Sequence, residues 1–283
     1  MPLVSIKDEL RKARAGRYAI PLFDVFDMAG AEGIIAALEA ARAPAMIGIY
    51  GPRIDQPGGA ALVAMVRELA AAAAVPVSLM LDHGASVEQC AKALSMGFTD
   101  VMYDGARLSV EENTANTRRV VEAARGRGAC VEAELGIVGA GADYETFGGV
   151  GKGFTDPAVA ARFVAESGCG CLAVAVGNAH GMPKGRARID MDLLAEISRR
   201  ARIPLAMHGG SGLSDEQYRQ SIAAGIAKIN IFTDLTAAAG EEMDKLFRAG
   251  KAGYFSVMAA IRDGFRSRAA RYIDVFGAGQ KAR

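Results

Sequence analysis

The stretch Leu205-Ala206-Met207-His208-Gly209-Gly210-Ser211-Gly212-Leu213-Ser214-Asp215-Glu216-Gln217 contains one complete passage from a strand into a helix. The apolar run Leu205–Met207 predicts a strand, and its lack of polar alternation is typical of a parallel strand that helices cover. Glycines then form a turn, and Gln217 stands three residues after Ser214, which is the spacing of a helix capping box. The order of strand, turn and capped helix is the unit from which parallel α/β folds are built.

The same unit recurs along the whole chain. Apolar or β-branched runs predict strands at Tyr18–Phe23, Ala45–Tyr50, Val77–Leu81, Asp100–Tyr103, Ala129–Leu135, Cys171–Val176, Leu205–Met207 and Lys228–Phe232. Amphipathic stretches between them predict helices, several of which begin at a capping residue: Ser86, Ser109, Asp190 or Ser214. The even spacing of these units favours closure into a (β/α)8 barrel over an open doubly wound sheet.

We predict one domain over residues 1–283, an α/β fold of the (β/α)8 TIM barrel type with an extra C-terminal helix. Beyond the last strand, two helical segments follow, Thr233–Phe247 and Phe255–Val275. No linker rich in proline or serine divides the chain, and its 283 residues are within the size range of one barrel. The Gly-x-Gly-x-x-Gly pattern of dinucleotide-binding folds does not follow the first strand.

Composition excludes several classes of function. Lysine and arginine total 33, aspartate and glutamate 32, and tryptophan is absent, so the chain lacks the basic excess and the stacking aromatics of a nucleic-acid surface. The longest apolar stretch, Ala60–Leu81, is interrupted by Arg67, Glu68 and Pro76 and predicts no membrane span. The N-terminus lacks a signal-peptide pattern and the four cysteines form no CxxC pair, so we expect a cytoplasmic protein with reduced thiols.

The three histidines of the chain all follow predicted strand ends. His83, His180 and His208 come just after the third, sixth and seventh predicted strands. In a barrel the chemistry takes place at the C-terminal ends of the strands, so we expect the three imidazoles to meet there. Three imidazoles with an open fourth position are a known catalytic Zn²⁺ arrangement, and neutral ligands leave the ion a strong Lewis acid toward a carbonyl. The sequence therefore predicts a zinc site.

A carboxylate, Asp82, directly precedes the first of these histidines. Neighbouring residues at a strand end point to different sides, so we expect Asp82 to face the substrate as an acid/base group instead of binding the same ion. The alternative is that Asp82 orients a histidine.

Two turns predict a phosphate site. Gly209-Gly210-Ser211-Gly212 follows the seventh strand, and Asn230-Ile231-Phe232-Thr233 ends the eighth strand and opens a helix. In barrels the loops after these two strands commonly supply backbone N–H groups to a phosphate. The segment His180-Gly181-Met182-Pro183-Lys184 adds a further glycine and a basic side chain.

Five motifs, in this order along the chain, resemble the class II (zinc-dependent) ketose-bisphosphate aldolases. They are Leu81-Asp82-His83-Gly84, Val131-Glu132-Ala133-Glu134-Leu135-Gly136, Gly177-Asn178-Ala179-His180-Gly181, Leu205–Gly212 and Lys228-Ile229-Asn230-Ile231. The similarity is to the branch that contains the tagatose- and fructose-bisphosphate aldolases and the phospho-dehydro-deoxygluconate aldolase. It extends from Val4-Ser5 to Phe276-Gly277-Ala278-Gly279, nearly the whole chain.

The resemblance implies a role for each candidate residue. His83, His180 and His208 would bind Zn²⁺, and Glu134 would approach the metal when substrate is absent. Asp82 would protonate the aldehyde oxygen in bond formation or take that proton in cleavage. Dihydroxyacetone phosphate would chelate the metal, which would stabilise the enediolate. Its phosphate, often with a monovalent cation such as Na⁺ or K⁺ nearby, would be held by Gly181, Lys184, Gly209, Ser211, Asn230 and Thr233.

Departures from the family pattern cluster on the side of the acceptor aldehyde, where Arg262 matches a family arginine. Asp24 stands in place of the usual asparagine and Tyr50 in place of a common serine. Ala142 replaces a glutamate implicated in proton transfer, within the glycine-rich segment Gly136–Phe154 that we interpret as a mobile lid. Because an added carboxylate repels a second phosphate, we expect cleavage of a ketose 1-phosphate or bisphosphate whose acceptor aldehyde differs from glyceraldehyde 3-phosphate.

The resemblance also implies a homodimer or homotetramer, and two other functions stay open. A phosphosugar epimerase or isomerase would need the same enediolate, and release of a triose phosphate would separate it from an aldolase. A non-catalytic sugar-phosphate-binding subunit of an aldolase complex would fit the loss of the lid glutamate. Zinc content together with a cleavage assay would separate that subunit from an enzyme.

Overall fold

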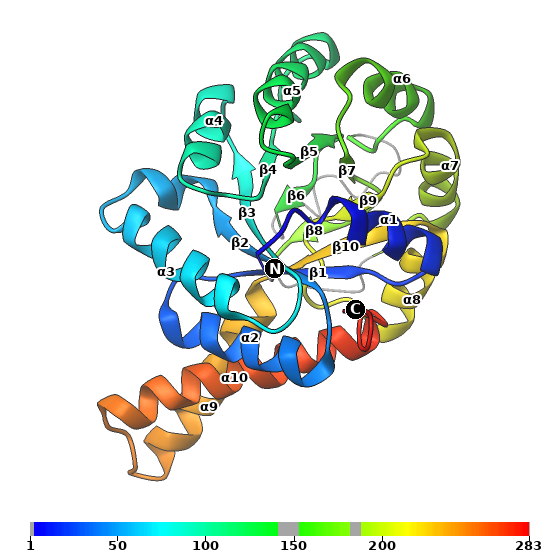
Figure 1. Cartoon of the computed structure of the whole chain (residues 1–283). Coiled ribbons are helices and arrows are strands. Elements are labelled where there is room, and N and C mark those ends of the chain that lie inside the picture. Colours follow the sequence, from blue (N-terminus) through cyan, green and yellow to red (C-terminus); the bar gives the residue numbers. More distant parts are fainter. Residues whose placement is uncertain (1–2, 141–152, 182–187, 283) are drawn as a thin grey trace.

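The computed structural model describes residues 3–140, 153–181 and 188–282, in which parallel strands close into an eight-stranded barrel. Around the barrel the order is β1-β10-β9-β7-β5-β4-β3-β2 (Figure 1). Barrel strands that are consecutive along the chain are therefore neighbours in the barrel, and the last strand pairs with the first. The barrel strands are β1 (Ile20–Asp24), β2 (Ala45–Tyr50), β3 (Val77–Gly84), β4 (Asp100–Tyr103), β5 (Cys130–Leu135), β7 (Cys171–Val174), β9 (Leu205–Met207) and β10 (Ile226–Ile231). The predicted fold class is confirmed.

Helices surround this barrel. They are α2 (Met28–Ala41), α3 (Gly59–Ala72), α4 (Val87–Ser95), α5 (Val110–Arg125), α6 (Pro157–Ser167), α7 (Met191–Ala201), α8 (Asp215–Ala224) and α9 (Thr233–Arg248). The extra C-terminal helix is α10 (Tyr254–Val275), which packs against α2 and α9. The turn between α9 and α10 extends beyond the ring of helices (Figure 1).

Local sequence explains how these helices begin. Ser109 and Ser214 form capping boxes with Glu112 and Gln217, and the side chain of Ser86 accepts a hydrogen bond from a backbone N–H of the first turn of its helix. Each cap fixes the point at which the chain turns from a strand into a helix. No helix in the described ranges is both long and apolar enough to cross a membrane.

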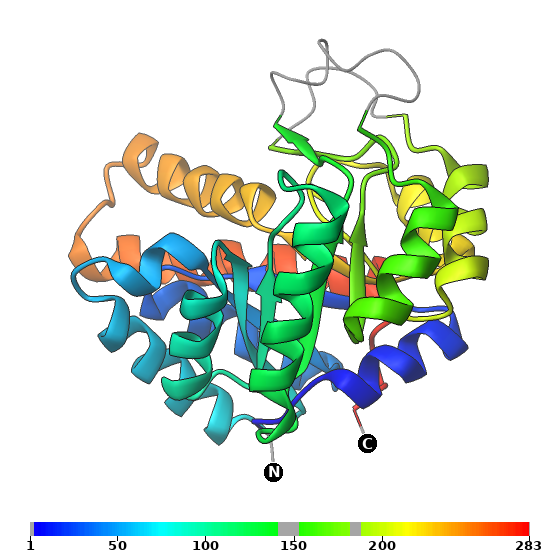
Figure 2. The same cartoon turned by 90° about the horizontal axis from the view of Figure 1, so that it is seen from above.

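A further helix, α1 (Lys7–Gly16), precedes the first strand and is not part of the predicted pattern. Its Leu10 and Ala13 are buried in one apolar cluster with Met80 and Met102 of the barrel strands. α1 thereby closes the N-terminal end of the barrel, and Figure 2 shows it at the end opposite the short parallel pair β6 (Gly139–Ala140) and β8 (Ala179–His180).

The structure differs from the predicted strand boundaries at one important place. β3 continues to Gly84, so Asp82 and His83 belong to the strand instead of following it. A short 3-10 helix, η1 (Gly51–Asp55), follows β2. Most of the predicted lid, including Ala142, lies outside the described residues.

Candidate active site

A pocket of about 720 Å³ lies at the C-terminal ends of the barrel strands. The candidate residues that line it are Asp24, Tyr50, Asp82, His83, Glu134, His180, Gly181, His208, Gly209, Ser211, Asn230 and Thr233. Lys184 lies outside the described residues. Arg262 lies on α10, where it pairs with the neighbouring Asp263 at 3.3 Å, and it is not among the residues that line the pocket.

The three histidines converge from three separate elements. His83 lies near the end of β3, His180 lies in β8 and His208 follows β9. The ring centroid of His83 is 5.1 Å from that of His180 and 4.6 Å from that of His208. One ring nitrogen from each histidine lies within 4.8 Å of the others, a spacing that could hold one metal ion.

The backbone at His83 turns its side chain into this group. Its φ angle is +52°, a left-handed conformation that non-glycine residues seldom adopt. The pairing of β3 with β4 shifts register between Leu81 and Gly84, as at a β-bulge. Bulges often re-aim a side chain beside an active site, and here the irregularity brings both Asp82 and His83 to the same pocket.

Carboxylates determine which nitrogen is protonated in two of these histidines. Nδ1 of His83 lies 2.9 Å from Oδ2 of Asp104, and Nε2 of His208 lies 2.7 Å from Oε1 of Glu132. Since an ionised carboxylate only accepts hydrogen bonds, these two nitrogens carry the proton. The opposite nitrogens, Nε2 of His83 and Nδ1 of His208, face each other across 2.9 Å, a distance at which they share one proton unless a cation replaces it. Such a donor set fits a cation.

The electrostatics of the site favour positive charge near His83. Burial opposes the charged imidazole, but the carboxylates of Asp82 and Asp104 outweigh it and raise the pKa of His83 to about 10. Burial and the neighbouring His208 lower the pKa of His180 to about 4. Without a metal ion, His83 therefore carries a positive charge at neutral pH, whereas His180 is neutral.

Behind His208 lies a fully buried ion pair. Nζ of Lys228 donates to Oε1 of Glu132 at 2.8 Å, and both side chains are at most 1% exposed. Despite its burial, the positive charge of Lys228 holds the pKa of Glu132 at about 2. Glu132 thus stays ionised as the acceptor that orients His208.

Asp82 is buried and held by an amide. Its Oδ1 accepts a hydrogen bond from Nδ2 of Asn230 at 2.9 Å, while its Oδ2 lies 4.0 Å from Nε2 of His83. The same amide nitrogen is 3.3 Å from Nδ1 of His208. Asn230 therefore fixes one carboxylate oxygen of Asp82 and leaves the other directed to the pocket.

Two more carboxylates line the pocket. Glu134 forms a second potential metal-binding group with His83 and Asp104, and burial raises its pKa to about 8. Burial, together with the nearby Asp82, also raises the pKa of Asp24 well above its ordinary value. In the part of the chain that the structure describes, Oε2 of Glu134 and Oδ1 of Asp24 are buried without a hydrogen-bond partner.

The two predicted phosphate turns lie together at the pocket. Gly209 has a φ angle of +62°, and its Cβ would lie 2.2 Å from the carbonyl oxygen of Ala179, so only glycine fits. Oγ of Ser211 accepts from the backbone N–H of Asp234 at 3.4 Å, which places this turn beside the first residues of α9. A helix N-terminus beside a glycine turn is suited to bind an anion.

Sequence reasoning assigned no role to four residues of this site. Asp104 and Arg107 line the pocket on the segment after β4, whereas Glu132 contacts His208 and Lys228 contacts Glu132. Asp104 follows a predicted strand end, which is a usable signal. Glu132 and Lys228 lie inside strands and 96 residues apart, so their pairing appears only in three dimensions.

A closed parallel barrel with a polar pocket at the C-terminal ends of its strands has the architecture of a barrel enzyme, and its histidine group could hold a metal ion. Residues 4–281 match the family described as fructose-bisphosphate aldolase class-II. The chain belongs to this family, and it is an aldolase.

Named relatives agree with this assignment. The chain is 39% identical over 241 residues to the 6-phospho-5-dehydro-2-deoxy-D-gluconate aldolase of Halalkalibacterium halodurans, covering 84% of this chain and 83% of the relative. It is 38% identical over 237 residues to the fructose-bisphosphate aldolase of Geobacillus stearothermophilus, covering 83% and 82%. The crystal structure of the YdjI aldolase from Escherichia coli K12 superposes with a TM-score of 0.89 at 31% identity, covering 99% of this chain and 100% of that one.

Proposed function

We propose that this aldolase is zinc-dependent and cleaves a ketose 1-phosphate into dihydroxyacetone phosphate and an aldehyde other than glyceraldehyde 3-phosphate. The observation that carries the proposal is the convergence of three histidines, with Nε2 of His83 and Nδ1 of His208 only 2.9 Å apart. His83, His180 and His208 would hold the ion, with Glu134 as an alternate ligand. Zinc suits three imidazoles with an open fourth position, and when bound it supplies Lewis acidity to a substrate carbonyl.

Asp82 is the residue to which we assign proton transfer. One of its oxygens is held by Asn230 at 2.9 Å, so the other faces the pocket in a fixed direction. In cleavage, Asp82 takes the proton of the hydroxyl group that becomes the aldehyde; in condensation it returns that proton to the aldehyde oxygen. With three histidines as ligands, no histidine of the chain is left for this role.

The phosphate of the donor half would bind between the two glycine turns. Backbone N–H groups at Gly181 and Gly209, together with the start of α9, supply donors without a formal charge. The side chains of Lys184, Ser211, Asn230 and Thr233 would add to this set of phosphate-binding groups. A Na⁺ or K⁺ ion would lie near the phosphate.

The acceptor half would face Asp24 and Tyr50. Asp24 supplies no positive charge for a second phosphate in either protonation state. When ionised it repels a phosphate, and when neutral it only donates a hydrogen bond. Gly48 makes room for it, because a Cβ at this position would lie 2.3 Å from Oδ1 of Asp24. This side of the pocket therefore suits hydroxyl groups better than a second phosphate.

A substrate panel tests the proposal. Purified zinc-loaded protein is assayed for release of dihydroxyacetone phosphate from ketose 1-phosphates and from fructose and tagatose 1,6-bisphosphate. The ketose 1-phosphates include some with a carboxylate at the end of the sugar opposite the phosphate and some without one. We expect a higher kcat/KM for a monophosphate, and Asp24→Asn should raise kcat/KM for the bisphosphates. Equal kcat/KM for all substrates would refute the acceptor assignment and leave the aldolase class untouched.

We also propose a homo-oligomer, a dimer or tetramer of one-domain chains in the cytoplasm. The end of α9 and the start of α10 expose Phe247, Tyr254 and Phe255, which are 63%, 76% and 84% exposed. Exposed aromatic clusters of this kind commonly mark protein interfaces, and a second copy would cover them. Light scattering of the wild type and of Tyr254→Ser/Phe255→Ser tests this: a monomeric wild type refutes it. The four free buried cysteines are consistent with a reducing compartment.

A further inference from the structure

A second pocket, of about 700 Å³, lies at the opposite end of the barrel from the histidines. Its walls are α1 and the segments that lead into β5, β7, β9 and β10, which is where these strands begin. In barrel enzymes the reaction takes place at the other end of the strands. The proposed aldolase chemistry therefore does not use this pocket.

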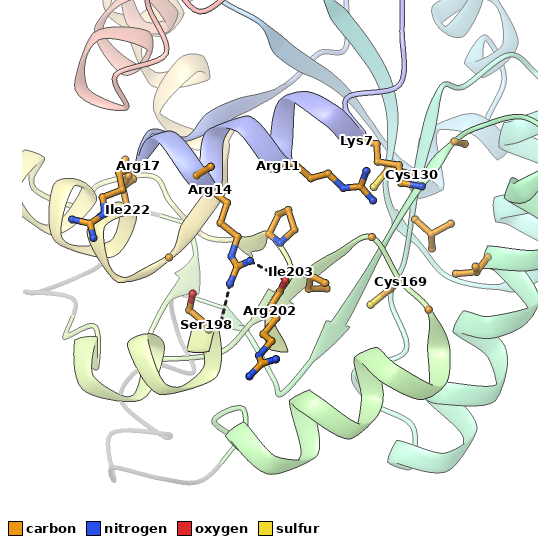
Figure 3. Close-up of a pocket in the computed structure, with 18 of the residues that line it drawn as sticks. Lys7, Arg11, Arg14, Arg17, Cys130, Cys169, Ser198, Arg202, Ile203 and Ile222 are labelled. Carbon is orange, nitrogen blue, oxygen red and sulfur yellow. Dashed lines mark hydrogen bonds between the residues drawn. The ribbon is translucent and has the colours of Figure 1, made fainter. Parts of the chain in front are cut away.

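The lining of this pocket is strongly basic. Lys7, Arg11 and Arg14 follow one another along one face of α1, at helical spacings of four and three residues (Figure 3). Among the described residues that line the pocket there is no aspartate or glutamate. The full set of basic lining residues is Lys7, Arg11, Arg14, Arg17, Arg125 and Arg202.

Most of these charges have no acidic partner. Arg11 pairs with Asp8 at 3.3 Å, and both side chains are mainly exposed. Arg14 donates to the carbonyl oxygens of Arg202 at 2.8 Å and Ser198 at 3.2 Å, which hold its guanidinium in place at the end of α7 (Figure 3). In the described ranges no ion pair involves Lys7, Arg17, Arg125 or Arg202. Like charges gathered without counterions repel one another, and a bound anion would remove that cost.

The floor of the pocket adds no free negative charge. The thiols of Cys130 and Cys169 are buried there, and burial raises the pKa of Cys169 to about 12 and that of Cys130 well above its ordinary value. The buried carboxylate of Asp100 contacts Cys130, but its oxygens already accept bonds from two hydroxyl groups and two backbone N–H groups.

We propose that this pocket binds a small multivalent anion, a metabolite that carries two or more phosphate groups. Planar guanidinium groups match pairs of phosphate oxygens, and Arg14 is already held in place by the α7 carbonyls. The cavity of about 700 Å³ is within the range of small-molecule pockets and larger than a single phosphate ion needs. Its concave shape favours a small molecule over an acidic protein surface.

Glucose 1,6-bisphosphate is a suitable probe, because it carries two phosphate groups and no ketone to cleave. Its binding to the zinc-loaded full chain is measured by calorimetry and by the shift in melting temperature. We expect Arg17→Gln/Arg202→Gln to raise the Kd at least about tenfold, the usual cost of losing charge-assisted contacts. Arg219→Gln, which removes an exposed arginine of α8 outside the pocket, serves as the matched control and should leave the Kd unchanged.

A variant at the other end of the barrel separates the two pockets. Ser211→Asp places a negative charge at the proposed catalytic phosphate turn and should leave the binding of the probe intact. The proposal is overturned if Ser211→Asp abolishes binding while Arg17→Gln/Arg202→Gln retains it. It is also overturned if sulfate at equal ionic strength gives the same stabilisation, or if only polyglutamate or RNA binds. If the double variant does not fold, Arg125→Gln replaces it with the same expected direction.

Discussion

Nε2 of His83 and Nδ1 of His208 lie 2.9 Å apart, although 125 residues separate them in the chain. Asp104 and Glu132 hold the opposite nitrogens of the two rings, so the two facing nitrogens are the ones left for a metal ion once the proton between them is released. The pair is therefore arranged for a cation before any substrate arrives. Each carboxylate behind a histidine is as much a part of this arrangement as the histidine itself.

The first prediction concerns the carboxylate behind His208. Glu132→Gln should weaken zinc binding about 10- to 100-fold, because a neutral amide holds the ring N–H of His208 more weakly than a carboxylate does and no longer offsets the charge of Lys228. Competition with a chromogenic chelator measures the affinity. Glu122→Gln, on the exposed surface of α5, is the control and should bind zinc as the wild type does. Unchanged affinity in Glu132→Gln would contradict the role of this contact.

Much of the site could be predicted because the C-terminal ends of the parallel strands all lie on one face of the barrel. His83 and His208 stand at such ends, His180 follows β7 in the short strand β8, and the apolar strands before them are easy to recognise. The left-handed backbone at His83 could not be predicted, because a histidine in that position gives no sequence signal. Nor could α1, whose buried face consists of little more than Leu10 and Ala13.

The buried pair Glu132 and Lys228 gives a second prediction, for stability. Lys228→Met leaves the Glu132 carboxylate buried without its counterion and should lower the free energy of unfolding by about 3–5 kcal/mol. The double variant Glu132→Gln/Lys228→Met should recover most of that loss, because no buried charge is left. Urea unfolding of the four proteins of the cycle, all in chelator, measures both values. A single variant that costs less than about 1 kcal/mol would show that the pair is not truly desolvated.

A third prediction concerns proton transfer. Asp82→Asn keeps the shape of the side chain and removes its capacity to exchange a proton, so kcat should fall about 10²- to 10⁴-fold. Zinc content and melting temperature should stay at the wild-type level, since we do not assign Asp82 as a ligand. Retained turnover would mean that another group moves the proton. Loss of zinc would instead place Asp82 among the ligands.

The packing of the C-terminal helix gives a fourth prediction. A Cβ at Gly33 of α2 would lie 2.3 Å from the carbonyl oxygen of Arg262 in α10. Gly33→Ala should therefore separate the two helices and lower the free energy of unfolding by about 1–3 kcal/mol. Gly240→Ala is the matched control, because a Cβ there meets nothing within 4 Å. That helical substitution should raise stability by about 0.5–1 kcal/mol, and equal effects of the two changes would refute the close contact.

The fifth prediction is a pH dependence at Asp100, which ties the N-terminal segment to the barrel floor. Its carboxylate accepts hydrogen bonds from Ser5, Ile6, Ser78 and Cys130. Burial outweighs these donors and raises its pKa from 3.8 to about 6. Between these two values the folded state holds a proton that the unfolded state has released. The contribution of this group to the free energy of unfolding is therefore complete below pH 3.8 and is lost as the pH rises through about 6.

Comparison of the wild type with Asp100→Asn isolates this contribution, because the other titrating groups are common to both proteins. Both are unfolded in urea with chelator present, so that zinc release at low pH does not enter. The advantage of the wild type over the variant should shrink by up to about 3 kcal/mol between about pH 4 and pH 7, since each pKa unit corresponds to roughly 1.4 kcal/mol. A difference that stays flat, or that grows with pH, would show that the four donors stabilise the ionised carboxylate more strongly than burial opposes it.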